Sequence, residues 1–244
     1  MRLVSWNILA GGGTRCRTIA ARLERCEADI LVLQETVATR GPDLCHQLAK
    51  AGYGYCFSAP RGPRERGLCL LSKLPLRRVD EPSPPHAAIY PRGWLEVELL
   101  APRWRIAAVY APAAGPLVPV FWRAAAEWVT CRGGLPFMML GDFNAGMSDV
   151  DAKGYRFKAG SAFARLPECG LVDLWRREHG TRREYTWFSR PPHGAAPRGF
   201  RIDHAFASRQ LSSHVTSCRY DHRVRKRGWS DHSMLMLDLD VPGS

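Results

Sequence analysis

Four short polar segments, spread over nearly the whole chain, place acidic or amide side chains beside apolar runs that are typical of buried strands. They are Ser5-Trp6-Asn7, Leu33-Gln34-Glu35-Thr36, Gly141-Asp142-Phe143-Asn144 and Ser230-Asp231-His232. Four such clusters at four strand ends predict one site where core strands converge. Acidic and amide oxygens without a cysteine cluster favour a hard cation such as Mg²⁺. The pattern therefore indicates a metal-dependent hydrolase.

Glu35 follows the apolar run 30–33 and Gln34, so we expect it in the loop where a buried strand ends. A carboxylate there either binds a metal ion or caps the next backbone turn, and the other three clusters favour the metal ion. Asn7 has the right chemistry to orient a carboxylate or to hold a phosphate oxygen, although a lone asparagine more often serves a turn.

Gly141-Asp142-Phe143-Asn144 is the most informative of the four segments. Gly141 allows the backbone to pass tightly, and Asp142 and Asn144 alternate onto one face of an extended segment. This spacing places a base beside an amide that can orient the attacked group. A turn after a strand would explain one of these two polar residues more easily than both.

His232 is the histidine most suited to chemistry, because it follows Asp231 in the last cluster. Its direct neighbour cannot easily share its face, so we expect its partner to be Asp203 from another strand. A carboxylate on one imidazole nitrogen would fix the tautomer and leave the other nitrogen for phosphate. We assign no role to His204 or to the other histidines.

The chain has 244 residues, 45% of them apolar, which suffices for one large α/β domain or two small ones. A formal net charge of +12 favours a polyanionic partner, either nucleic acid or an anionic membrane surface. Most of this charge is arginine, and a GC-rich coding bias with a solvated surface explains it about as well.

The eight cysteines are scattered and form no Cys-x-x-Cys pair. We interpret them as small buried thiols in a reducing compartment rather than as disulfides or zinc ligands. The first residues lack an apolar signal region, and no stretch approaches the length of a membrane span. We therefore expect a cytoplasmic protein without a membrane span.

Apolar periodicity and glycine or proline breaks predict many strands and few helices. Strands are expected at 2–8, 30–34, 53–58, 67–72, 76–79, 94–100, 103–110, 137–140, 185–188, 200–207, 215–220 and 233–239, and helices at 14–25, 42–51 and 116–131. In the last helix, Val120, Ala124 and Trp128 share one face. Two packed sheets with helices outside, in a single domain over 1–244, would satisfy this order.

Six motifs, in this order along the chain, resemble those of the endonuclease/exonuclease/phosphatase superfamily. They are Trp6-Asn7, Leu33-Gln34-Glu35-Thr36, Val109-Tyr110-Ala111-Pro112, Gly141-Asp142-Phe143-Asn144, Arg201-Ile202-Asp203-His204 and Ser230-Asp231-His232. The resemblance extends from residue 2 to about 239. It implies a four-layer α/β/β/α sandwich of two packed mixed sheets flanked by helices, with a divalent-metal site at one end of the sheets.

The resemblance also implies a role for each matched side chain. Glu35 would be the main ligand of Mg²⁺, or of Mn²⁺ in its place, with Asp231 as a further ligand or a nearby acid. Asp142 would activate the attacking water or protonate the leaving group. Asn144 and Asn7 would hold the reacting groups, and the metal ion would polarise a phosphoryl oxygen.

In the same comparison, Asp203 would orient His232, which stabilises the phosphate or takes a proton. Tyr110 resembles the exonuclease III-like branch of abasic-site nucleases, since other branches carry a histidine at this strand end. Leu9 and Ala113 depart from that branch, which has Asp or Asn at the first position and Asn at the second. Specificity for a damaged site is therefore not implied by these two positions.

Basic and aromatic residues near the motifs are candidates for substrate contact. They are Phe200, Arg201, Arg225, Arg227 and Trp229, with further arginines at 61, 64, 66, 190 and 198. Arginines would give phosphate contacts and salt-dependent affinity. Phe200 and Trp229 would stack on a base or line a pocket beside a flipped sugar, although core packing explains them equally well.

The favoured hypothesis is a Mg²⁺-dependent phosphodiesterase, specifically a DNA nuclease, that uses an activated water as an endonuclease or a 3′-exonuclease in DNA repair. We expect it to act as a monomer without a protein partner. The alternative is a phosphatase or phosphodiesterase that acts on a small or lipid phosphate. A non-catalytic binding module is disfavoured, because every matched catalytic position keeps a competent side chain.

Overall fold

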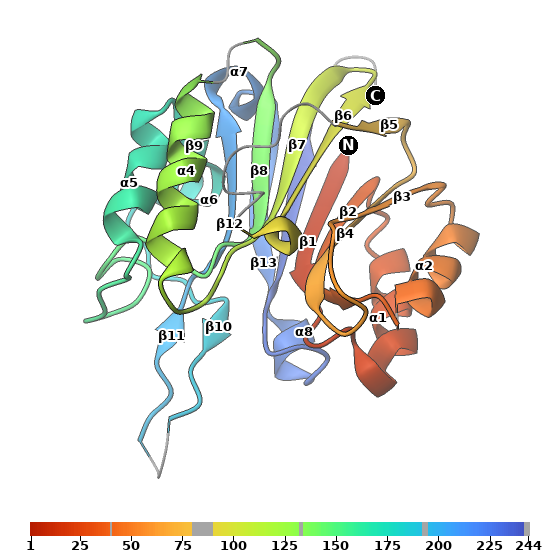
Figure 1. Ribbon diagram of the computed structural model, residues 1–244, viewed down its shortest axis with the longest axis horizontal. Coiled ribbons are helices and arrows are strands. Elements are labelled where there is room, and N and C mark those ends of the chain that lie inside the picture. Colours follow the sequence, from red (N-terminus) through yellow and green to blue (C-terminus); the bar gives the residue numbers. More distant parts are fainter. Residues whose placement is uncertain (40, 80–89, 132–133, 192–194, 242–244) are drawn as a thin grey trace.

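Two six-stranded mixed sheets pack face to face in the computed structural model, which describes residues 1–39, 41–79, 90–131, 134–191 and 195–241 (Figure 1). In spatial order, the first sheet contains β13 (Val215–Asp221), β14 (Met234–Leu239), β1 (Arg2–Asn7), β2 (Ile30–Val37), β4 (Arg66–Ser72) and β3 (Tyr55–Ser58). The second contains β5 (Leu76–Arg78), β6 (Trp94–Leu100), β7 (Arg103–Tyr110), β8 (Phe137–Asp142), β12 (Asp203–Ser208) and β9 (Leu171–Asp173). Parallel pairing joins β1 to β2 and β7 to β8, and the other neighbours are antiparallel.

Helices cover the outer face of each sheet. The first sheet is covered by α1 (Cys16–Glu24) and α2 (Gly41–Lys50), and the second by α4 (Leu117–Cys131) and α5 (Gly160–Glu168) (Figure 1). The predicted four-layer α/β/β/α sandwich is therefore confirmed. None of the helices in the described part of the chain is long and apolar enough to cross a membrane.

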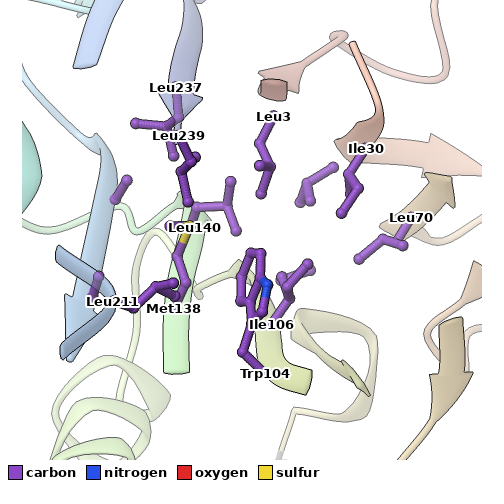
Figure 2. Packing of buried hydrophobic residues seen from close by; sticks show 14 of the residues in the cluster. Leu3, Ile30, Leu70, Trp104, Ile106, Met138, Leu140, Leu211, Leu237 and Leu239 are labelled. Carbon is purple, nitrogen blue, oxygen red and sulfur yellow. The ribbon is translucent and has the colours of Figure 1, made fainter. Parts of the chain in front are cut away.

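Side chains alternate between the two faces of each strand, so the apolar residues form three layers. One layer lies between the two sheets, and the other two lie between each sheet and its helices. In β2, Ile30 and Val32 face the second sheet, whereas Leu31 and Leu33 face the helices α1 and α2. Both faces of the strand are buried, which explains why its sequence is continuously apolar rather than alternating. Figure 2 shows the layer between the sheets, where Leu3 and Ile30 approach Ile106.

Every strand prediction overlaps an observed strand, but the helix predictions need correction. The sequence periodicity did not predict α5 or the short helices α6 (Leu174–His179), α7 (Arg209–Ser212) and α8 (Arg223–Lys226). In α4, Val120 is 41% exposed although Ala124, on the same predicted face, is buried. Aromatic packing sets the rotation of this helix instead, because Phe121 and Trp122 are fully buried and contact each other.

The polar motifs lie at the end of the sandwich away from the two chain termini (Figure 1). There β1 ends beside β2, with Asn7 paired to Gln34, and β8 ends beside the start of β12, with Asp142 paired to Asp203. A two-stranded ribbon, β10 (Trp187–Phe188) and β11 (Gly199–Phe200), extends beyond this end, near α8 (Figure 1). The strand ends therefore converge as the motif order predicts.

Candidate active site

Glu35 lies inside β2 rather than in the loop after it, which corrects the prediction from its sequence position. The register between β2 and β4 shifts between Leu33 and Thr36, and Glu35 has a φ of 57°. Such a bulge inserts an extra residue and re-aims a side chain without ending the strand. The bulge therefore turns the carboxylate of Glu35 away from the regular ladder and toward the end of the sandwich.

The two carboxylate oxygens of Glu35 have different surroundings. Oε2 accepts hydrogen bonds from the backbone N–H of Ala10 at 2.8 Å and from the guanidinium of Arg66 at 3.0 Å. Among the described residues, Oε1 has a long contact of 3.4 Å with the hydroxyl of Tyr110. Burial raises the pKa of Tyr110, and the negative charges of Glu35 and Asp142 raise it further, so the phenol keeps its proton.

Asp142 ends β8 and is almost completely buried. Its Oδ2 accepts a hydrogen bond from the side-chain amide of Asn7 at 2.9 Å, and its Oδ1 accepts one from the backbone N–H of Asn144 at 3.0 Å. The extended alternation expected here is wrong, because Asn144 has a φ of 45° and its amide donates to the carbonyl of Ala111 at 2.9 Å. A turn, rather than a strand, places Asn144 beside Asp142.

His232 lies between two aspartates, and Asp203 is its hydrogen-bond partner as predicted from the sequence. Nδ1 of His232 is 3.0 Å from Oδ2 of Asp203, and Nε2 is 3.9 Å from Oδ2 of Asp142. Ser230 holds this loop against β1, since its hydroxyl donates to the carbonyl of Asn7 at 2.6 Å and accepts from the N–H of His232 at 3.1 Å.

The charges of this cluster reinforce one another. Burial lowers the pKa of His232, but the charges of Asp203 and Asp142 raise it by more, to about 10. Burial raises the pKa of Asp142 to about 7, although the positive charge of His232 opposes the rise. At neutral pH the cluster therefore contains an imidazolium beside a carboxyl group that can take up or release a proton.

Glu35 and Asp231 each carry a carboxylate oxygen that makes few contacts within the described residues. Oδ2 of Asp231 accepts a hydrogen bond from Nε1 of Trp187 at 3.1 Å, whereas Oδ1 is buried and has no partner in the part of the chain that the structure describes. Together with the weakly bonded Oε1 of Glu35, this leaves carboxylate oxygens available to a hard cation. Asp142, Asp203 and His232 also lie within 4.8 Å of one another, but a protonated His232 already supplies the positive charge there.

Arg201 cannot contact a substrate, which corrects its prediction as a substrate-binding residue. Its side chain is fully buried, with Nε 2.7 Å from a carboxylate oxygen of Asp151 and Nη2 2.6 Å from one of Asp173. These two aspartates occupy both sides of the guanidinium. Arg201 therefore links the segment that contains Asp151 to Asp173 at the end of β9, and it does not reach the surface.

The other residues predicted for substrate contact lie near the site end of the sandwich. Phe200 is half-buried, with its ring 5.6 Å from that of Trp187. Arg225 is half-buried above the ring of Phe188 at 4.4 Å. Arg227 is exposed and lies over the half-buried ring of Trp229 at 5.1 Å.

Trp187 is a site residue that the sequence did not single out. It donates a hydrogen bond to Asp231, and its ring centroid is 6.3 Å from that of His232. The only signal was its place in a short aromatic run. Arg66 was noted only as a candidate for substrate contact, and its ion pair with Glu35 depends on the pairing of β2 with β4.

Gly141 controls the placement of Asp142. It has a φ of 151°, and a Cβ atom there would lie 1.9 Å from the carbonyl oxygen of Val109 on β7. Gly141→Ala is therefore expected to lower the free energy of unfolding by about 3 kcal/mol or more, because backbone must shift. Urea denaturation would measure this, with Gly54→Ala as the matched control, since that glycine has open space around it. A cost below 1 kcal/mol would contradict the argument.

The chain is a two-sheet sandwich with a buried carboxyl group beside an imidazolium at one end. The model of the Endonuclease/Exonuclease/phosphatase family matches residues 4–232, and the chain belongs to this family. The predicted superfamily is thereby confirmed.

Curated and solved relatives extend this comparison. The chain is 24% identical, over 99% of its length and 71% of the relative's, to a DNA-(apurinic or apyrimidinic site) endonuclease of Dictyostelium discoideum. An AP endonuclease from Archaeoglobus fulgidus superposes with a TM-score of 0.81 at 18% identity, covering 99% of this chain and 100% of the other. A 3′ phosphatase from Neisseria bound to a product DNA hairpin superposes with a TM-score of 0.79 at 22% identity and the same coverage. The structural matches support the fold, and the relatives agree with the predicted branch.

Proposed function

We propose that this protein is a divalent-metal-dependent phosphodiesterase that cleaves DNA at damaged or 3′-blocked sites during repair. The observation that carries the proposal is the buried carboxyl group of Asp142, bound by Asn7 and Asn144 and adjacent to the imidazolium of His232. The names of the relatives, an apurinic-site endonuclease and a DNA-bound 3′ phosphatase, support DNA as the substrate. A DNA-repair role would place the protein inside the cell.

One copy of the chain suffices for this chemistry. Asn7, Glu35, Asp142, Asp203 and His232 all come from a single chain and lie at one end of one sandwich. We therefore propose that residues 1–244 act as a single domain and that the enzyme works as a monomer.

Glu35 and Asp231 are the proposed ligands of Mg²⁺, which Mn²⁺ can replace. When bound, the cation would polarise a phosphoryl oxygen and offset the negative charge that develops during hydrolysis. The ion pair between Arg66 and Glu35 lies on the side of Oε2, so Oε1 remains available to the cation. Tyr110 contacts that same oxygen and would orient it.

Asp142 is the proposed acid/base residue. A carboxyl group with a pKa near neutrality can take a proton from the attacking water or give one to the leaving oxygen. Asn7 and the turn at Asn144 fix its two oxygens, which orients the group before substrate binds. The imidazolium of His232, held by Asp203, would donate a hydrogen bond and positive charge to a phosphoryl oxygen through Nε2.

Substrate contact is proposed for the ribbon and for the segment around α8. Arg225 and Arg227 would bind phosphates on either side of the cleaved bond. Phe200 and Trp229 would pack against the deoxyribose or a neighbouring base. Leu9 and Ala113 depart from the abasic-site branch, so a comparison of abasic and 3′-phosphate duplexes measures which phosphate ester the enzyme prefers.

The test is cleavage of three labelled duplexes, which are intact, abasic, or nicked with a 3′-phosphate. We expect hydrolysis of at least one duplex with Mg²⁺, loss of activity in EDTA and recovery when Mg²⁺ is in excess. Glu35→Gln should require about 10- to 100-fold more Mg²⁺ for half-maximal activity, because the amide removes the charge that attracts the cation. Glu127→Gln, on the exposed face of α4, is the matched control and should leave the requirement unchanged.

Two outcomes would contradict this function. Full activity in EDTA would exclude the metal-dependent chemistry. A folded protein that hydrolyses inositol phosphates or phospholipid headgroups, but none of the three duplexes, would instead establish the alternative of a small or lipid phosphate.

A further inference from the structure

Three cysteine sulfurs meet on the outer face of the first sheet. Cys45 comes from α2, Cys56 from β3 and Cys69 from β4. Their sulfurs are 3.5 Å apart between Cys45 and Cys56, 3.6 Å between Cys56 and Cys69, and 3.8 Å between Cys45 and Cys69. None of the proposed catalytic steps uses these thiols.

The strand pairing explains how the cysteines come together. In the β3–β4 ladder, Cys56 is opposite Leu71 and Ser58 is opposite Cys69. Cys56 and Cys69 are therefore diagonal neighbours on the same face of the sheet. Helix α2 lies over that face, where Leu44 and Leu48 pack with Cys69, and it adds Cys45 as the third corner of a triangle.

The size of this triangle matches a metal site rather than a disulfide. Four sulfur ligands placed tetrahedrally at about 2.3 Å from zinc would be separated from one another by about 3.8 Å. The three observed separations approach this value together. A disulfide would bring one pair of sulfurs to about 2.05 Å and leave the third cysteine out. Three sulfurs at nearly equal distances fit a shared central ion better.

We propose that Cys45, Cys56 and Cys69 form a three-thiolate zinc site, with water in the fourth position. Soft thiolate ligands select zinc over Mg²⁺, so this site is distinct in chemistry from the acidic one. It does not rest on the proposed nuclease activity, because its three ligands belong to no step of that mechanism.

The surroundings give an ion access to the three sulfurs. A pocket of about 430 Å³, lined by Cys45, Cys69 and Arg61 among others, lies beside the sulfurs. The exposed Cys56 offers a path for the metal ion, and the pocket offers space for the water ligand.

A metal ion bound by the three cysteines would link α2 to β3 and β4, the two strands on either side of a loop that contains arginines. Segment 59–65 connects β3 to β4 and carries Arg61 and Arg64. It leads directly to Arg66, which binds Glu35. Zinc would thus tie α2 to the base of this loop and hold Arg66 near the acidic cluster.

The test is a metal titration of the full-length, reduced and metal-free chain. We expect one Co²⁺ per chain to produce a thiolate-to-cobalt charge-transfer band, even with excess Mg²⁺ present, and Zn²⁺ to abolish it by displacement. Oxygen ligands at Glu35 and Asp231 cannot produce that band. Cys56→Ser should weaken Co²⁺ and Zn²⁺ binding by at least about 100-fold.

Cys56→Ser is suited to this test because the side chain is exposed, so its loss does not open a cavity. Cys169→Ser, at a cysteine remote from the triangle, is the matched control and should keep the band and the affinity. Zinc should also raise the unfolding temperature of the wild type and of Cys169→Ser but not of Cys56→Ser. Absence of the band, or equal affinity in Cys56→Ser, would overturn the proposal.

Discussion

Asp142→Asn is expected to lower the rate of DNA hydrolysis by about 10³-fold, because it removes the proposed proton acceptor and donor. An amide does not exchange a proton near neutral pH, whereas the buried carboxyl group of Asp142, with its pKa raised to about 7, does. The substitution keeps the shape of the side chain. The loss should therefore appear in the chemical step and leave DNA affinity nearly unchanged.

The contacts of Asp142 indicate why the variant should still fold. The asparagine oxygen can accept from either Asn7 or the backbone N–H of Asn144, so one of the two present hydrogen bonds is kept. Losing the other costs about 1 kcal/mol, or somewhat more if a buried donor is left without a partner. This loss of folding stability is small, so the variant should stay folded while its rate of hydrolysis falls.

Single-turnover cleavage with enzyme in excess measures the chemical step directly. Asp149→Asn is the matched control, because Asp149 is exposed and its φ of 63° is one that asparagine also tolerates. The control should retain the wild-type rate. A rate for Asp142→Asn within tenfold of wild type, with DNA binding intact, would remove Asp142 from the mechanism.

The sequence predicted best those strands that are buried on both faces. Strands such as β2 and β8 are continuously apolar because helices cover one side and the opposite sheet covers the other, so their pattern is visible locally. The helices α6, α7 and α8 have between four and six residues. Segments that short are stabilised by tertiary packing rather than by their own periodicity, so no local pattern predicts them.

In the candidate site, too, the sequence predicted what local motifs show and missed what depends on strand pairing. Asn7, Asp142, Asp203 and His232 were predicted together, and hydrogen bonds join Asn7 to Asp142 and Asp203 to His232. What the sequence could not show was the pairing that depends on register. The bulge at Glu35 arises from a shift against β4, which the residue types do not encode locally.

The cysteines illustrate the limit of spacing arguments. Cys45, Cys56 and Cys69 have no zinc-ligand spacing, and their interpretation as small buried thiols is wrong for Cys56, which is exposed. Their approach depends on a diagonal pair across β3 and β4 and on the position of α2 above it. A ligand set drawn from three elements becomes visible only when the elements are placed in space.

Arg201→Met is expected to lower the free energy of unfolding by about 3–5 kcal/mol at neutral pH. Arg201 is fully buried and bridges the carboxylates of Asp151 and Asp173. Methionine approaches its volume but leaves the buried Asp173 without its arginine, whereas Asp151 keeps only Arg176 as a partner among the described arginines. The cost of uncompensated charge, rather than a cavity, should therefore dominate.

The pH dependence identifies that cause. Burial by itself raises the pKa of Asp173, but the charge of Arg201 lowers it well below its ordinary value in the wild type. This contribution to stability is fully present above the unfolded pKa of about 3.9 and is lost as the pH falls through the lower folded pKa. In the variant, the charge of Arg201 no longer opposes the effect of burial on Asp173. The pKa of Asp173 in the folded state therefore rises above its unfolded value, and the folded state takes up a proton more readily. The deficit of the variant should then be largest near pH 7 and smaller near pH 5.

Urea denaturation of wild type and variant at these two pH values separates charge from packing. Arg209→Met, at an exposed arginine on α7, is the matched control and should differ little from wild type at either pH. A deficit of the same size at both pH values would assign the loss to packing alone. A deficit that shrinks on acidification would show that Arg201 serves as the buried counter-ion of Asp151 and Asp173, which is why an arginine next to the motif of Asp203 does not reach the substrate.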